Sequence, residues 1–249
     1  MSDDTEDLCE ALLLEADALR ERLLAAPPKN QAAMDKNGEA FLARYTYNSN
    51  AIEGNTLSLS ETALVLQGVP IPSKPMKDHL EAIGHADAYR YVEGLAKSKP
   101  PITEELIKDV HSFVLLDKPM ERGHFRTCDV VIVGAGHVPP SSDLVPALLR
   151  DLLADYSASS LHPIELAAMF HLDFESIHPF IDGNGRTGRL IMNLMLMKEN
   201  YPPIIIAVAN KARYIDCFRS YHADHSPRRM IRLVAECAVQ ELKSRLAMG

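Results

Sequence analysis

Apolar residues recur every three or four positions along most of the chain, which is the spacing of one face of an α-helix. Helix starts are expected at Ser60 and Thr103, because a hydroxyl cap satisfies exposed N–H groups. Stops are expected at Pro27-Pro28 and Gly54. The pattern predicts helices over residues 8–24, 39–53, 61–66, 77–96, 104–116, 143–156, 163–177, 186–198, 210–222 and 228–246. Within 77–96 the inward positions are expected to be Leu80, Ile83, His85 and Ala88.

One segment breaks the helical pattern. The β-branched run Val130–Val133 precedes Gly134-Ala135-Gly136, and Val138 then leads into Pro139-Pro140. Such a run followed by glycines predicts a short hairpin. A lone hairpin is marginally stable unless it lies against something else. We therefore expect an all-α fold, a helical bundle with one short β-hairpin.

The composition indicates a globular chain. Its 249 residues are 47% hydrophobic, which is enough for a sizeable core, and they contain no repeat, low-complexity tract or linker. The formal net charge is −8, and residues 1–25 hold six of those negative charges. The remainder is nearly neutral. Non-specific binding to nucleic acid or to an anionic membrane needs a basic surplus, so neither partner is expected.

The cysteine spacing, the N-terminal residues and the longest apolar run indicate a cellular compartment. The four cysteines show neither C-x-x-C nor zinc-finger spacing. The start of the chain is acidic where a signal peptide is basic, and the longest apolar run, 190–197, is too short for a bilayer. We expect a soluble, cytoplasmic protein.

A segment between two apolar helices carries the chemistry. Residues 178–189 read H-P-F-I-D-G-N-G-R-T-G-R. Gly183, Asn184 and Gly185 allow the positive φ angles that turn several backbone N–H groups inward as an anion nest. The helix that follows directs its own free N–H groups to the same place, as phosphate sites require.

The side chains around this nest suit phosphate chemistry. Arg186 and Arg189 lie three residues apart on one helix face, close enough to bind one polyphosphate. Asp182 supplies a hard oxygen ligand of the kind Mg²⁺ takes when phosphates provide the rest. His178 is best suited to accept a proton near neutral pH, a role worth roughly 10²- to 10⁴-fold in rate.

Other interpretations of this segment are weaker. Gly183-x-Gly185-x-x-Gly188 has the spacing of a dinucleotide fingerprint, but that motif follows a strand in a βαβ unit, and here a helix and His-Pro precede it. The spacing of a P-loop is absent. A purely structural glycine-rich turn would not require a base, a carboxylate, a nest and two arginines within twelve residues.

Residues 178–189 resemble the signature of the Fic family, H-x-F-x-(D/E)-G-N-G-R-x-x-R, at every specified position. Residues 161–168 are similar to the family's preceding helix, and residues 123–126 with the hairpin over 131–140 resemble its approach and flap. The resemblance covers roughly residues 75–225. It implies the Fic fold with three parts: an N-terminal helical region over 1–74, a catalytic core over 75–225 and a C-terminal helix over 226–249 packed on that core.

The resemblance implies transfer of AMP from ATP to a Ser, Thr or Tyr hydroxyl of a protein, with release of pyrophosphate. His178 would deprotonate the hydroxyl, and Asp182 would hold Mg²⁺, or alternatively Mn²⁺, against the phosphates. Arg186 and Arg189 would bind the β- and γ-phosphates. Positioning and charge neutralisation supply most of such catalysis. Relatives that phosphorylate instead carry Lys at the position of Gly185, so AMP transfer is favoured over kinase activity.

The resemblance also implies the rest of the nucleotide site. Tyr214 and Ile215 match positions that enclose the base in relatives, and His222 stands where an Asn is often found. The edge of the hairpin would pair with an extended segment of the target protein. The expected ATP-binding residues are Val131, Ile132, Val133, Gly134, Asp182, Gly183, Asn184, Gly185, Arg186, Thr187, Gly188, Arg189, Tyr214, Ile215 and His222.

A second motif lies upstream. Residues 49–55 match the family's inhibitory motif, (S/T)-x-x-x-E-(G/N), through Ser49, Glu53 and Gly54. On a helix Ser49 and Glu53 share a face, and a bidentate pair between Glu53 and Arg189 would occupy the place that the γ-phosphate needs. The resemblance therefore implies the self-inhibited class with an N-terminal inhibitory helix.

Alternatives stay open beside AMP transfer. In some relatives the inhibitory glutamate positions a water that removes AMP from a modified protein, so a metal-dependent de-AMPylase using Glu53 is the first alternative. A catalytically silent nucleotide-binding module is the second. Self-modification and a homodimer are also open. Five other histidines are expected at ordinary partly buried sites: His79, His85, His111, His124 and His137.

Overall fold

The chain is described by a computed structural model over residues 3–27, 31–132 and 136–247. Helices account for all its regular structure, and no strand occurs within these ranges. The elements are α1 (Asp3–Ala25), α2 (Gln31–Ile52), α3 (Leu59–Leu66), α4 (Met76–Ala96), α5 (Glu104–Val114), η1 (Ser142–Leu144), α6 (Val145–Ala158), α7 (Pro163–Ile177), α8 (Asn184–Lys198), η2 (Val208–Asn210), α9 (Lys211–Asp224) and α10 (Arg228–Ala247).

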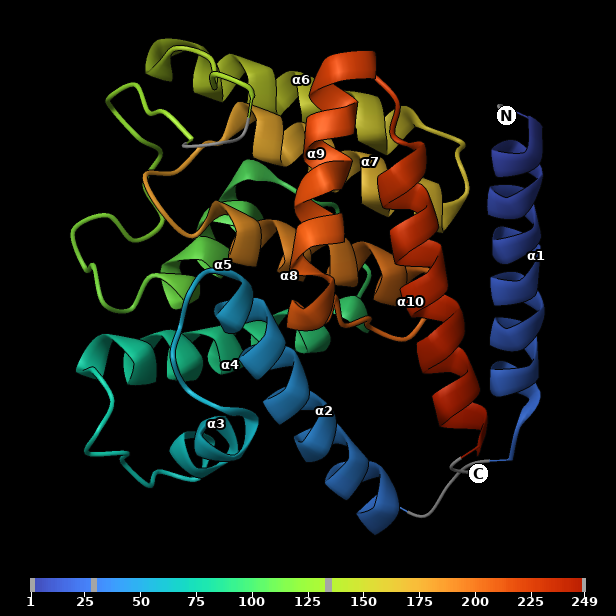
Figure 1. Cartoon of the computed structure of the whole chain (residues 1–249), viewed down its shortest axis with the longest axis horizontal. Helices are drawn as coiled ribbons and strands as arrows, with labels where there is room; N and C mark the ends of the chain where they lie inside the picture. Colours follow the sequence, from blue (N-terminus) through green and yellow to red (C-terminus); the bar gives the residue numbers. More distant parts are fainter. Residues whose placement is uncertain (1–2, 28–30, 133–135, 248–249) are drawn as a thin grey trace.

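Helix α8 forms the centre of the bundle (Figure 1). It contacts α7, α4, α5 and α2. Every residue from Leu190 to Leu196 on it is buried, including Asn193. A helix that is apolar on all sides has to be covered on all sides. Asn193 is satisfied inside the core, because its side chain exchanges two hydrogen bonds with the backbone of Ile204, at 2.8 and 3.0 Å. The second half of α8 is thereby fixed to the segment that contains Ile204.

The two N-terminal helices lie on different parts of the molecule (Figure 1). α1 runs along α10, whereas α2 packs on α3 and α4 and reaches α8. Asp17 anchors α1, because its carboxylate accepts a hydrogen bond from the Tyr201 hydroxyl and lies 3.4 Å from His162. The C-terminal end of α2 meets the first half of α8, where Arg189 contacts Ser49.

Several helix boundaries differ from the sequence prediction. α2 begins at Gln31 and runs through Gly38, because one glycine in a helix costs only about 1 kcal/mol. The cap of α3 is Ser58, not Ser60. The Ser58 hydroxyl accepts from the Glu61 N–H, and the Glu61 carboxylate accepts from the Ser58 N–H, which is a complete capping box. Ile83, expected to face inward, is 38% exposed because α4 buries Gly84 instead.

The hairpin predicted over residues 131–140 is not formed by the residues that are described. Residues 130–132 and 136–140 have no strand structure, and 133–135, which include the candidate residues Val133 and Gly134, lie outside the described ranges. Val131 and Val138 are strongly exposed. Among the described helices, none is both long and apolar enough to cross a membrane.

Gly84 provides a stability test. It lies where α4 crosses α5, and a Cβ there would collide with the backbone carbonyl oxygen of Phe113. We expect Gly84→Ala to lower the free energy of unfolding by about 1–3 kcal/mol, as overpacking does. Gly94, on the same helix, has open space around it, so Gly94→Ala should raise stability by up to about 1 kcal/mol. Urea unfolding of both variants checks this, and equal effects would contradict the close crossing.

Candidate active site

A cavity of about 480 Å³ opens at the N-terminal end of α8. The end of α2, the end of α7, the loop before α8 and one face of α9 form its walls. Its lining residues are Ile52, Glu53, Ile132, Glu175, His178, Ile181, Asp182, Gly183, Asn184, Gly185, Lys211, Tyr214, Ile215, Phe218, Arg219 and His222. Elements far apart in the sequence thus meet at the segment 178–189.

His178 stands at the C-terminal end of α7 in the left-handed conformation, with φ of 50°. Its backbone carbonyl accepts a hydrogen bond from Arg126 Nε at 2.8 Å, and the Arg126 N–H donates to Pro179 at 3.0 Å. Arg126 therefore holds the strained turn in place. Burial lowers the pKa of the His178 imidazole to about 4. The ring is neutral at pH 7 and able to accept a proton.

The loop that follows is fixed by Asn184. Its amide oxygen accepts from the Phe180 N–H at 2.9 Å, and its amide nitrogen donates to the Phe180 carbonyl at 2.8 Å. His111 supports the loop from beneath, 3.0 Å from the Asp182 carbonyl and stacked on Phe180 with ring centroids 3.6 Å apart. The expectation of an ordinary, partly buried His111 missed this role, because nothing in its local pattern indicates which loop it meets.

Asp182 lies at the cavity edge between two cations. Its carboxylate accepts from Lys118 Nζ at 2.7 Å and lies 3.4 Å from Arg186 Nη2. Burial raises the pKa of this carboxyl, but Lys118 and Arg186 outweigh burial and hold it below the ordinary value. No group of three His, Cys, Asp or Glu residues suited to a metal occurs in the described part of the chain. Asp182 is therefore a single hard ligand that fits a divalent ion only together with oxygens from a bound molecule.

Arg189 is buried behind Glu53. Its Nη2 donates to Glu53 Oε1 at 2.8 Å and to the Ser49 carbonyl at 2.9 Å, and its Nε lies 3.1 Å from Ser49 Oγ. The pair with Glu53 uses one carboxylate oxygen, not the expected two, because Ser49 and Tyr214 take the other donors. Glu53 lines the cavity and Arg189 does not, so the carboxylate covers the guanidinium. Gly54, with φ of 96°, ends this segment as the motif predicts.

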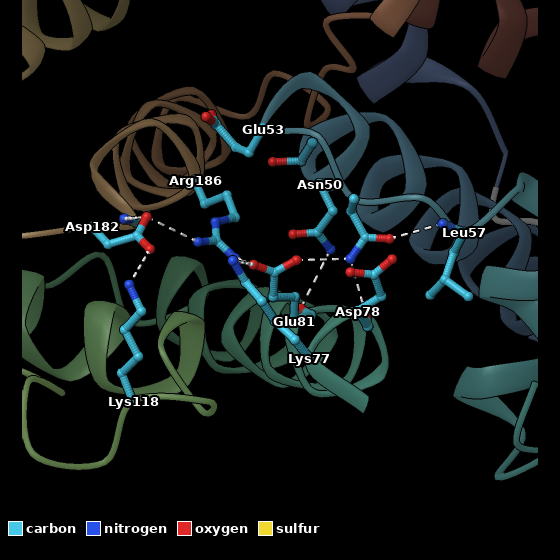
Figure 2. A network of polar contacts seen from close by, with 12 residues as sticks. Asn50, Glu53, Leu57, Lys77, Asp78, Glu81, Lys118, Asp182 and Arg186 are labelled. Carbon is cyan, nitrogen blue, oxygen red and sulfur yellow. Dashed lines mark hydrogen bonds and ion pairs between the residues drawn. The ribbon is translucent and has the colours of Figure 1, made fainter. Parts of the chain in front are cut away.

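Arg186 does not line the cavity, and Figure 2 shows its side chain beside Glu81. Its side chain is 2% exposed, and its Nη1 lies 3.3 Å from the buried carboxylate of Glu81 on α4. Glu81 also accepts from Asn55 Nδ2 at 2.8 Å. The two arginines expected to share one ligand thus point to different helices. Their spacing of three residues rotates them apart by about 60°, which is enough for separate partners when each is buried.

The remaining candidates fall into two groups. Ile132, Gly183, Gly185, Ile215 and His222 line the cavity with Tyr214, whereas Val131, Thr187 and Gly188 do not. Gly188 packs against His171. The Tyr214 hydroxyl accepts from Arg189 Nη1 at 3.1 Å and lies 2.7 Å from His171 Nε2, so this side chain supports Arg189 as well as forming a wall.

Comparison with known proteins agrees with this geometry. The model of the Fic/DOC family matches residues 101–196. Protein adenylyltransferase Fic of Drosophila willistoni is 36% identical over 247 residues, which are 97% of this chain and 49% of that protein. The protein of the same name from Nematostella vectensis is 36% identical over 97% of this chain and 57% of its own length. The structure of Fic-1 from C. elegans superposes with a TM-score of 0.88 at 30% identity, over all of this chain and 74% of that one. The chain belongs to the Fic family.

Both the fold and the motif of this chain are those of the Fic family. The helical bundle of this Fic chain is that of Fic-1, and residues 178–189 are the family signature. The chain spans about half the length of the two curated relatives. The family match starts at residue 101 and so does not include the segment that carries Glu53.

Buried histidines around the site predict a pH dependence of stability. Burial lowers the pKa of His171 to about 3 and that of His111 to about 4. Below pH 6.5 each of these histidines is protonated in the unfolded chain but stays neutral in the folded chain. The free energy of unfolding therefore falls as pH falls toward these pKa values. For His171 the loss between pH 7 and pH 5 is about 2 kcal/mol, at about 1.4 kcal/mol per pH unit below pH 6.5.

Urea unfolding of wild type and His171→Gln at pH 7 and pH 5 measures this contribution. The variant should lose about 2 kcal/mol less than wild type over that interval. The exposed His124 offers a matched control, since His124→Gln should leave the interval unchanged. Identical losses in wild type and His171→Gln would show that the pKa of His171 is not depressed.

Proposed function

We propose that the chain is a protein adenylyltransferase that transfers AMP from ATP to a Ser, Thr or Tyr hydroxyl of a protein and is held inactive by Glu53. The observation that carries the proposal is the contact between Glu53 and Arg189 in the cavity that also holds His178 and Asp182. Base, metal ligand, phosphate loop and inhibitory carboxylate are therefore within one site. The two curated relatives named above are protein adenylyltransferases, which supports the same chemistry.

In this proposal His178 accepts the proton of the target hydroxyl as its oxygen attacks the α-phosphorus of ATP and pyrophosphate leaves. A neutral imidazole is required, and burial favours that form. The N–H groups at the start of α8 face the phosphates, because Gly183 with φ of 75° turns the loop into the helix. Arg189 binds the terminal phosphate once Glu53 has left it.

A divalent ion fits beside Asp182 in the proposed complex. Mg²⁺, or alternatively Mn²⁺, bound there with phosphate oxygens supplies neutralisation of the charge on the transferring group. Lys118 holds the same carboxylate at 2.7 Å and keeps it oriented toward the cavity edge. Asp182 is the only carboxylate of the signature, so its removal should abolish metal-dependent turnover.

We further propose the division of labour that the resemblance implies. Residues 1–74 regulate, 75–225 catalyse, and 226–249 form a helix that supports the core. The segment 131–140 serves as the flap that pairs with the target. Val131 and Val138 are exposed beside the cavity wall formed by Ile132, which suits docking of an extended peptide.

Removing the Glu53 carboxylate tests the proposal. We expect Glu53→Gly to raise incorporation of label from α-³²P-ATP by 10-fold or more, because Arg189 becomes free to bind phosphate. His178→Ala in the same background should abolish the incorporation. Label on the chain itself reports self-modification in the same assay. Equal, low incorporation by wild type and Glu53→Gly, with ATP bound by both in calorimetry, would contradict inhibition by Glu53.

De-AMPylation is the second candidate. Glu53 lines the cavity with its side chain 38% exposed, so its carboxylate could also orient a water toward a bound AMP group. Incubating an AMPylated target with wild type and with Glu53→Gln separates the two functions. Release of AMP by wild type alone would identify a de-AMPylase. Release by neither, with activation by Glu53→Gly, supports transfer as the activity.

A further inference from the structure

Glu175 is the one acidic side chain of the cavity that the proposed reaction does not use. It lies on α7, three residues before His178, and lines the same cavity. Its side chain is 15% exposed. Its Oε1 is sealed from solvent, and no described residue donates a hydrogen bond to it. Burying a carboxyl oxygen without a hydrogen-bond partner costs free energy of folding. A functional role for Glu175 would explain why this cost is tolerated.

The second oxygen of Glu175 faces the imidazole. Oε2 lies 3.7 Å from His178 Nδ1, longer than a hydrogen bond but within ion-pair distance. Nδ1 is itself sealed from solvent and has no side-chain hydrogen-bond partner among the described residues, while the nearby Glu175 backbone raises the pKa of the ring. His178 has a left-handed backbone at the end of α7, and its unpartnered Nδ1 faces Oε2 of the same carboxyl group whose Oε1 is unpartnered. Catalytic contacts in unliganded enzymes are often long and tighten with substrate.

A group that contacts Nδ1 determines which tautomer the His178 imidazole adopts. The ring can accept a proton at Nε2 only when its own proton is on Nδ1. A carboxylate at Nδ1 stabilises that tautomer and the imidazolium formed during the reaction, as a base and its orienting acid do in many hydrolases. A protonated carboxyl group would instead donate to Nδ1 and leave the proton on Nε2, where it blocks the base.

We propose that Glu175 is a positioning residue for His178, whose carboxylate holds the proton on Nδ1 and presents the Nε2 lone pair to the target hydroxyl. The inference rests on the proposed function, since it assigns the orienting partner of the same base. On transfer, the hydroxyl proton moves to Nε2, the Nδ1 proton stays hydrogen-bonded to Glu175, and the imidazolium later releases its proton to solvent.

The charges around Glu175 connect it to the inhibitory segment. Burial and the Glu53 carboxylate raise the pKa of Glu175 to about 8, while Arg189 opposes them. Tyr214, Lys211 and Arg219 face the cavity from α9, and Arg126 and Asp182 act on His178 from the other side. In the resting state Glu175 is therefore largely protonated at neutral pH. Removal of the Glu53 carboxylate therefore lowers the pKa of Glu175 and favours its carboxylate form.

The kinetic test uses the Glu53→Gly background. Glu175→Gln should lower kcat about 10²-fold, within the range that a general base contributes, while the KM for ATP stays within 2-fold. The rate of Glu53→Gly should rise with pH through the ionisation of Glu175, with a midpoint below 8 because Glu53 is gone, and Glu175→Gln should flatten this limb. Glu165→Gln, on the same helix but away from the cavity, is the matched control and should change neither quantity.

A second measurement does not depend on activity. In ¹⁵N-histidine-labelled protein, the His178 ring shifts should show the Nδ1–H tautomer in Glu53→Gly at pH 8, and a larger share of Nε2–H in Glu53→Gly, Glu175→Gln. An unchanged tautomer together with an unchanged kcat and pH profile would overturn the assignment. If Glu53→Gly is inactive but the tautomer still responds to Glu175→Gln, the proposed transfer reaction fails and the positioning role stands.

Discussion

A single buried guanidinium determines how this structure is arranged. Arg189 is 1% exposed in the second turn of the central helix, and a buried charge must have partners in fixed places. Those partners come from two sides: Ser49 on α2 with Glu53 directly after it, and Tyr214 on α9. The end of α2 therefore lies where it does because Arg189 needs an anion and acceptors there. Breaking this set without a substitute would leave a buried cation unpaired.

The same requirement makes the site responsive to its ligand. A molecule that replaces Glu53 must bring its own negative charge to Arg189, and a phosphate group does so with more acceptor oxygens than a carboxylate. Under the proposed function, withdrawal of Glu53 and binding of a phosphate group would be coupled through the Arg189 side chain. A ligand shifts such an equilibrium only by its differential affinity for the two states. An apolar molecule of similar size could not form an ion pair with Arg189 in place of Glu53. The contact between Glu53 and Arg189 therefore favours anionic ligands over apolar ones.

Sequence alone predicted the parts of this picture that depend on local spacing. The all-helical class, most helix boundaries and the compact segment 178–189 follow from periodicity and from the family motif. The family comparison confirmed the fold and the membership. The orientation of Arg186, by contrast, is set by the carboxylate of Glu81, which is more than 100 positions away in sequence. No local pattern carries that information.

The same limit explains the other residues that sequence analysis missed. His111 and Glu175 look like ordinary helix positions until the loop and the cavity are assembled around them. Ser58 was missed for a different reason, since two serines precede Glu61 and only the capping box distinguishes them. The roles of His111 and Glu175 depend on long-range packing, and the role of Ser58 depends on its reciprocal hydrogen bonds with Glu61. The helices and the motif, by contrast, follow from local spacing.

Glu81 links the inhibitory segment to the phosphate loop (Figure 2). Its carboxylate lies 3.3 Å from Arg186, and its backbone carbonyl accepts from Asn50 Nδ2 at 3.3 Å. Asn55 binds the same carboxylate, so residues on both sides of Glu53 are tied to one buried acid on α4. A shift of the end of α2 that withdrew Glu53 from Arg189 would also disturb the partners of Arg186. Under the proposed function, the two signature arginines would be coupled through α4, and the loop before α8 would respond to the position of α2 even though Arg186 does not line the cavity.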